Sequence, residues 1–119
     1  MVTIAKPAPK EKLILGYITG SQKLPWDIHY TKPGQFISGA ITLARDEINN
    51  DPRWLPNHEI DFVIAETFGH EEYSIRETVG LMEKNISAFI GPQETCIHEG
   101  RITASFNYPM VTYVSIDAI

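Results

Sequence analysis

Cys96, His98 and Glu99 are close together in the sequence, and their types could support nucleophilic catalysis. A helix N-terminus favours the reactive thiolate form of a cysteine, and a histidine can pair with that thiolate. However, residues two positions apart on a helix point in different directions, and the neighbouring carboxylate of Glu94 would disfavour the thiolate. We therefore predict no catalytic residue in this chain.

Cys96 is the single cysteine of the chain, so no disulfide can form within it. Three interpretations stay open: a buried thiol, a reactive thiol, or half of a bridge to residues outside this sequence. A structural or bridging cysteine is favoured over a catalytic one.

Small polar residues and glycine follow the predicted strands. In an open parallel sheet, ligands bind beyond the carboxyl ends of the strands, where backbone N–H groups and helix N-termini converge. The sequence therefore predicts contacts with a polar ligand at this edge, without identifying the ligand. The predicted contact residues are Thr19, Thr67, Gly91, Gln93, Thr95 and Ser115.

Other function classes lack support. No phosphate-binding GxxxxGK[ST] or GxGxxG motif is present, and the four histidines form no compact ligand set, so we predict neither a cofactor nor a metal. The net charge of −5 and the pI of about 5.3 argue against a nucleic-acid partner. No apolar run approaches the roughly 18 residues of a membrane span, and the first residues lack the apolar run of a signal peptide.

Asn85-Ile86-Ser87 is an N-glycosylation sequon, which makes Asn85 a candidate glycan acceptor in a secreted context. Such triplets also arise by chance, so the sequon gains weight only from other indications of secretion.

Short apolar runs alternate with amphipathic helical patterns after a flexible lead-in of residues 1–11. This order predicts βαβ units and an α/β fold with a Rossmann-like parallel sheet. The predicted strands are 13–17, 60–65, 86–90 and 110–114, and the predicted helices are 37–48, 71–84 and 95–107. The first strand is expected to be buried on both faces because its apolar run is nearly continuous.

Each helix is expected to bury an apolar stripe. In the first, the charged and amide residues Arg45, Asp46, Glu47 and Asn49 should face away from the sheet. The predicted stripes are Ile37, Ala40, Ile41, Ala44 and Ile48; then Ile75, Val79 and Met82; then Ile97, Ile102 and Ala104.

No helix follows the last predicted strand, which would leave an apolar edge open. We therefore expect residues 12–119 to be the incomplete N-terminal portion of a larger domain.

Five segments in this order and spacing resemble the extracellular domain of receptor guanylate cyclases, especially the invertebrate type. The second and third of them together also resemble, more loosely, the wider family of type I periplasmic-binding-like receptors. The segments are Leu15-Gly-Tyr-Ile-Thr-Gly20, Ser38-Gly-Ala-Ile41, Asp46-Glu-Ile-Asn-Asn-Asp-Pro52, Ile90-Gly-Pro-Gln-Glu-Thr-Cys96 and Tyr108-Pro-Met-Val-Thr-Tyr113.

The resemblance implies part of lobe one of a two-lobed clamshell, exposed on the extracellular side of the plasma membrane. It further implies a peptide or small-molecule ligand and a homodimer in the full-length receptor, which signals through a transmembrane helix to cyclic GMP synthesis. This chain alone is expected to be non-catalytic and to meet the membrane only through segments outside it.

The resemblance also assigns individual residues. The cysteine that matches Cys96 is disulfide-bonded in the family, but the two partner positions hold Tyr73-Ser74 and Val114-Ser115 here. An anion site of some hormone receptors would map to Thr67, Thr95 and Cys96.

Two alternatives remain open from the sequence. One is a small cytosolic flavodoxin-like α/β enzyme or response module that uses Cys96. The other is an amino-acid or solute-binding receptor domain that depends on Thr95 and Ser115.

Overall fold

The computed structural model describes residues 10–93 and 96–113, and over these residues four parallel strands alternate with three helices. The predicted α/β class is therefore confirmed. The elements are β1 (Glu11–Thr19), α1 (Gly34–Asn50), β2 (His58–Glu66), α2 (Glu71–Met82), β3 (Ala88–Ile90), α3 (Ile97–Ser105) and β4 (Met110–Val111). β1 begins at Glu11, the last residue of the predicted lead-in, whose residues 1–9 lie outside the described part.

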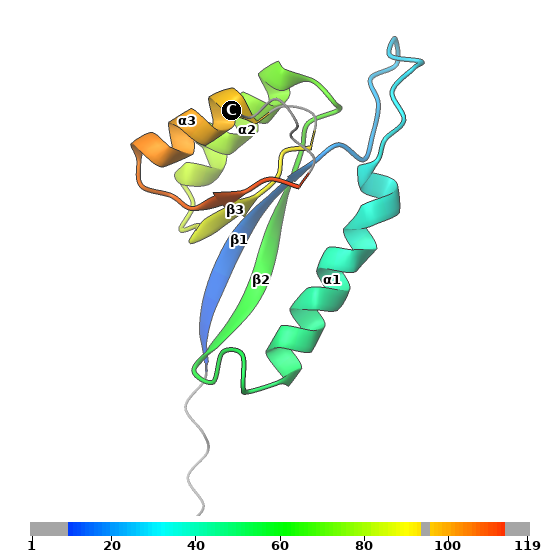
Figure 1. Ribbon diagram of the computed structural model, residues 1–119. Helices are drawn as coiled ribbons and strands as arrows, with labels where there is room; N and C mark the ends of the chain where they lie inside the picture. The colour runs from blue at the N-terminus through cyan, green and yellow to red at the C-terminus, as the bar shows by residue number, and fades with distance from the viewer. Residues whose placement is uncertain (1–9, 94–95, 114–119) are drawn as a thin grey trace, which may run out of the picture.

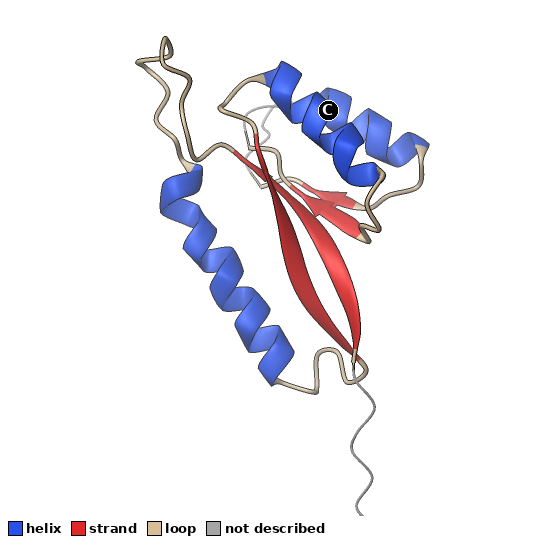
Figure 2. Ribbon diagram, turned by 180° about the vertical axis from the view of Figure 1, so that it is seen from behind, coloured by secondary structure: helices blue, strands red, loops and turns tan. Residues whose placement is uncertain are grey.

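The sheet has the strand order β2-β1-β3-β4, with every pair parallel. β1 and β2 pair along nine residues, from Glu11 opposite His58 to Thr19 opposite Glu66. Helices α2 and α3 cover one face, whereas α1 lies on the other (Figures 1 and 2). Because all strands run the same way, their carboxyl ends share one edge of the sheet.

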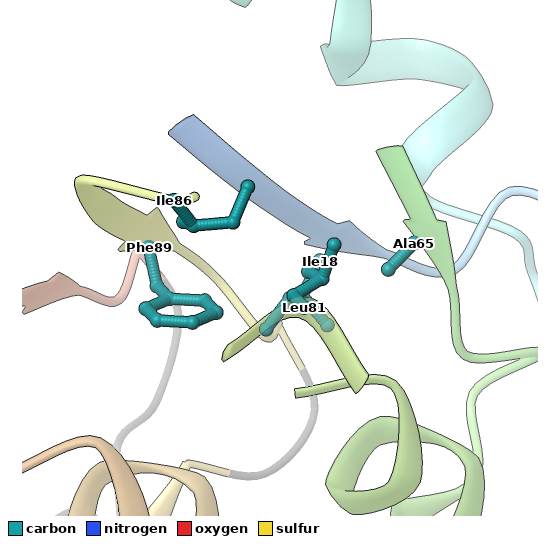
Figure 3. Close-up of a cluster of buried hydrophobic side chains, with 5 residues drawn as sticks. All are labelled: Ile18, Ala65, Leu81, Ile86 and Phe89. Atoms are coloured by element: carbon teal, nitrogen blue, oxygen red, sulfur yellow. The ribbon is translucent and has the colours of Figure 1, made fainter. Parts of the chain in front are cut away.

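The hydrophobic core lies between the sheet and helix α2. Side chains from β1, β2, α2 and β3 meet there, and the ring of Phe89 packs edge-on against Tyr108 with 5.5 Å between the ring centroids. Only the carboxyl half of β1 is buried, so the predicted burial on both faces holds for that half alone. The core residues are Ile18, Ala65, Leu81, Ile86 and Phe89 (Figure 3).

Helix α1 presents a different face to the sheet than its apolar pattern predicted. The three isoleucines of the predicted stripe are half-buried, but Ala40 and Ala44 are exposed. Asn49 instead faces β2: its side chain donates to the carbonyl of Ile60 and accepts from the N–H of Ile60, both at 2.8 Å. The outer edge of β2 has backbone groups that need partners, and a helix amide satisfies two of them.

Arg45 also faces the sheet, against prediction. Its guanidinium lies 3.3 Å from Asp61 and 5.8 Å from the ring centroid of Phe62. Asp46 and Glu47 are exposed, as predicted.

The stripes predicted for α2 and α3 are only partly correct: Ile75, Met82 and Ile102 are half-buried, and Met82 packs against the core. Val79, Ile97 and Ala104 are exposed, while the buried positions are Ser74, Thr78 and Leu81 on α2 and Glu99 and Thr103 on α3. The threonine hydroxyls donate to carbonyls one turn back on their own helices, at 2.8 Å for Thr78 and 3.0 Å for Thr103. A hydroxyl satisfied in this way can be buried like a small apolar group.

The third and fourth strands are shorter than predicted. Ile86 and Ser87 precede β3, and Thr112 and Tyr113 follow β4, while Val114 lies outside the described residues. Helices α2 and α3 are also shorter than predicted, with Cys96 as the N-cap position of α3.

Candidate functional site

The structure brings Thr19 and Thr67 together at the carboxyl edge of the sheet. Thr19 ends β1, Thr67 follows β2, and the N–H of Thr67 donates to the carbonyl of Thr19 at 3.0 Å. Each residue is only 1% exposed. The sequence therefore predicted their proximity, but gave no sign that both would be buried.

The loop between β1 and α1 folds over this edge. His70 Nε2 lies 3.0 Å from Asp27 Oδ2, and the Tyr30 hydroxyl donates to the carbonyl of Gly20 at 3.3 Å. Gly69 is required beneath the loop, because a Cβ there would lie 2.3 Å from the Tyr30 ring. The loop and the β2–α2 turn thus close the edge together.

Glu66 is the polar centre of this edge, although it is not among the contact residues predicted from the sequence. Its carboxylate accepts hydrogen bonds from the N–H of Ser21 at 2.9 and 3.1 Å, from the Ser21 hydroxyl, and from the N–H of Phe68 at 2.9 Å. A carboxylate directly after an apolar strand was the available signal. Its partner is 45 positions away, so spacing could not reveal it.

The β2–α2 turn is strained. Phe68 has φ +55° and Gly69 has φ +77°. A bulky residue with positive φ costs conformational energy and persists only where its surroundings hold it, which is common at ligand sites. Phe68 is held by its hydrogen bond to Glu66 and by an edge-on contact with the Tyr73 ring at 5.2 Å.

Gly91 and Gln93 extend the edge beyond β3. Gly91 has φ +97°, and a Cβ there would lie 2.1 Å from the carbonyl oxygen of Ile18, so only glycine fits. Among the described residues, Gln93 Oε1 and Thr19 Oγ1 are buried side-chain atoms without a hydrogen-bond partner. Unsatisfied buried polar atoms are rare and indicate a water, an ion or a ligand group. Thr95 and Ser115 lie outside the described residues.

The geometry does not support the Cys96 enzyme. The thiol is 5% exposed, and Nδ1 of His98 contacts a carboxylate oxygen of Glu71 on α2. Ser74, at one position where the resemblance placed a partner cysteine, donates to Glu99 Oε2 at 3.0 Å. The disulfide predicted for Cys96 remains a prediction.

Asn85 lies in the turn between α2 and β3, at the end of the sheet opposite the candidate ligand edge (Figure 1). The residue is exposed, as a glycan acceptor must be, while Ile86 beside it is buried in the core.

A hollow of about 430 Å³ lies between α3 and β4, and its lining does not include Thr19, Thr67, Gly91 or Gln93. It is lined by residues that include Cys96, Gly100, Arg101, Thr103, Tyr108 and Thr112. It adjoins β4, the edge strand, and nothing in the structure shows what covers it.

Comparison with known proteins identifies the family. The family model described as the receptor family ligand binding region matches residues 37–118. This match covers more than half of the chain, so the chain belongs to that family, whose periplasmic-binding-protein-like fold agrees with the parallel sheet seen here.

Three relatives are receptors or guanylate cyclases. Receptor-type guanylate cyclase Gyc76C of Drosophila melanogaster is 35% identical over 85% of this chain. Guanylate cyclase 32E of the same organism is 29% identical over 68%, and the Resact receptor of Arbacia punctulata is 29% identical over 64%. The aligned segments make up only 6%, 7% and 8% of these relatives. Nothing in these comparisons favours the alternative functions.

No helix within residues 10–93 and 96–113 has both the length and the apolar character needed to cross a membrane.

Proposed function

We propose that this chain is part of the extracellular ligand-binding region of a receptor-type guanylate cyclase. The observation that carries the proposal is the match of residues 37–118 to the receptor ligand-binding family, together with guanylate cyclases among the relatives. In the complete receptor, ligand binding outside the cell stimulates cyclic GMP synthesis within it. The chain itself contributes recognition and no chemistry.

The ligand contacts lie at the carboxyl edge of the sheet in this proposal. Three features support this position: two buried polar atoms without partners, a strained turn at Phe68, and a loop closed over the edge through Asp27 and His70. Because Thr19 and Thr67 are each 1% exposed, a ligand reaches them only when the residues packed on them move. Gly91 and Gln93 complete the described part of the contact set, and Thr95 and Ser115 belong to it as sequence predictions.

A two-part experiment tests the receptor assignment. The complete transcript that contains this chain is expressed in cultured cells with an epitope tag before the segment, and surface labelling and cyclic GMP are measured. We expect labelling without permeabilisation and cyclic GMP production. An Asn85→Gln variant should migrate faster on a gel, as the wild type does after glycosidase treatment. A product confined to the cytosol, with no cyclic GMP formed, would refute the assignment.

The ligand edge is tested separately with isosteric variants. For any ligand that raises cyclic GMP, Thr19→Val or Gln93→Leu should raise the half-maximal concentration by about tenfold, the value of one hydrogen bond. The matched control is Thr42→Val, because Thr42 is exposed on α1. If the ligand has the same half-maximal concentration in the edge variants and in the control, the ligand site lies elsewhere. The receptor assignment would be unaffected.

The remaining features of the proposal are homodimerisation of the complete receptor, a peptide or small-molecule ligand, and a disulfide from Cys96 to a cysteine outside this chain. One relative is named for resact. Resact is therefore a reasonable first compound to apply in the cyclic GMP assay.

A further inference from the structure

A polar seam joins the first turns of α2 and α3, where Glu71 contacts His98 and Ser74 donates to Glu99. Within this seam, one nitrogen of His98 and one carboxylate oxygen each of Glu71 and Glu99 all lie within 4.8 Å of one another. Glu71 directly follows the β2–α2 turn and His98 lies two positions after Cys96, so the seam adjoins the carboxyl edge. Glu71, His98 and Glu99 do not belong to the contact set proposed above.

Glu99 distinguishes this group from ordinary surface acids. Its side chain is 0% exposed, and Ser74 donates a hydrogen bond to Oε2 at 3.0 Å. A buried carboxylate is costly unless its charge is compensated. Both carboxylates lie in the first turn of their helices, so the seam joins two helix N-termini.

The other two members can move and are reached from solvent. The side chains of His98 and Glu71 are 58% and 38% exposed, and the two contact each other directly. A metal ion would replace this contact with two coordinate bonds. Bonds of about 2.0–2.2 Å to each ligand place ligand atoms roughly 3.4 Å apart in tetrahedral geometry, so the two exposed side chains need only small rotations.

We propose that Glu71, His98 and Glu99 bind a zinc ion, although the sequence predicted no metal site. Imidazole nitrogen with carboxylate oxygen is a donor set suited to zinc, whereas calcium requires six to eight oxygen ligands. Three protein ligands leave a fourth position for water. Ser74 orients Glu99 by hydrogen bonding, as outer-shell groups do for metal-ligating carboxylates.

Zinc at this position joins the N-terminus of α2 to the first turn of α3. Its coordinate bonds would hold the start of α3, directly after Cys96, against α2. This attachment does not require a disulfide at Cys96. A protein that binds zinc only in its folded state is stabilised by the ion, so the site also predicts a zinc-dependent rise in unfolding temperature.

The test is zinc titration of the purified 119-residue chain without a histidine tag, by isothermal calorimetry and thermal unfolding. We expect one zinc per chain and a raised unfolding temperature. His98→Ala and Glu71→Gln should each weaken binding by at least about tenfold and remove the thermal shift. Both side chains are partly exposed, so these variants are expected to fold, which far-ultraviolet circular dichroism checks.

The matched controls are His58→Ala and Glu72→Gln. His58 forms a similar pair with Glu11 at 3.4 Å, and Glu72 neighbours Glu71 on α2, but neither belongs to the three-residue group. Both controls should keep wild-type affinity within about twofold, because no ligand is removed. The proposal is overturned by an absence of saturable binding up to about 1 mM zinc, or by equal losses in the controls and the ligand variants.

Discussion

The two faces of the sheet are held by different forces. On the α2 side, apolar side chains from four elements form the core, and Leu81 and Phe89 are at most 3% exposed. Helix α1 lies on the other face (Figure 2). There it contacts the sheet through hydrogen bonds and an ion pair, while Phe36 and Leu43 of α1 are 80% and 60% exposed. The helix with the strongest apolar pattern is thus the one whose apolar residues are least buried.

The contacts on the two faces have different roles: those on the α2 face mainly stabilise the fold, and those on the α1 face mainly orient the helix. Apolar burial scales with area and gives most of the folding free energy, so the α2 face should dominate stability. Directional hydrogen bonds contribute less, but they fix orientation. On the α1 face, Tyr17 shares a 2.9 Å hydrogen bond with Ser38, and Asn49 pairs with the backbone of Ile60. These contacts fix the orientation of α1 against the sheet.

Leucine-to-alanine substitutions on the two faces should give the largest contrast. Leu81→Ala removes a buried core side chain and should lower the free energy of unfolding by about 2–5 kcal/mol. Leu43→Ala, with the same chemical change on exposed α1, should alter it by less than about 0.5 kcal/mol. Urea unfolding followed by circular dichroism measures both. Similar losses for the two variants would mean that both faces are equally buried in solution.

Ser74→Ala tests the buried polar contact between α2 and α3. It removes the hydroxyl that donates to the fully buried carboxylate of Glu99, and a hydrogen bond to a charged group is worth about 1.5–3 kcal/mol. Metal-free protein should lose stability in this range. The control is Ser105→Ala. Ser105 is exposed, and its hydroxyl donates to the carbonyl of Arg101 on the same helix. If Ser74→Ala leaves the free energy of unfolding unchanged, the burial of the Glu99 carboxylate does not depend on this hydrogen-bond donor.

Asn49→Ala tests the polar attachment of α1. The substitution leaves the N–H and carbonyl of Ile60 without their side-chain partner, but water can reach this edge of the sheet, so we expect a loss of about 1–2 kcal/mol. Hydrogen exchange of the Ile60 amide should accelerate at the same time. The exposed neighbour Asn50 provides the control in Asn50→Ala. If the Ile60 amide of Asn49→Ala exchanges at the wild-type rate, the hydrogen bonds between Asn49 and Ile60 are contradicted.

The sequence predicted the order of strands and helices because each strand is a short apolar run closed by polar or glycine residues. It also predicted that Thr19 and Thr67 would meet, because parallel strands end at one edge. Both inferences rest on local pattern and on a general property of parallel sheets. The receptor resemblance added the family, and the match to residues 37–118 bears it out.

The buried helix faces could not be predicted in the same way. Ser74, Thr78 and Thr103 look polar in sequence, but their burial depends on hydrogen bonds made within the folded helices or across the seam. The side-chain pairs Ser21–Glu66, Asp27–His70, Glu71–His98 and Ser74–Glu99 are separated by 25 to 45 positions, so no sequence motif records them. Long-range polar contacts of this kind follow from the packing and not from periodicity.

Arg53→Ala should have the smallest effect, at the turn after α1. The Arg53 side chain, and secondarily its backbone N–H, hydrogen-bonds to Asp51 and lowers the pKa of that carboxyl below its ordinary value. The folded state therefore binds the proton more weakly than the unfolded chain, and the small stabilisation, present near neutral pH, is lost as the pH falls below about 4. In the variant the pKa of Asp51 should rise toward its ordinary value, though the backbone donor remains.

Carbon-detected NMR titration of the Asp51 carboxyl measures this rise, with the exposed Arg101→Ala as control. The Arg53 side chain is 89% exposed, so solvent screens the pair and unfolding at neutral pH should barely change. A large loss of stability at neutral pH would contradict the division between the two faces. It would mean that a solvent-exposed turn on the α1 side carries folding free energy that the buried α2 face is expected to supply.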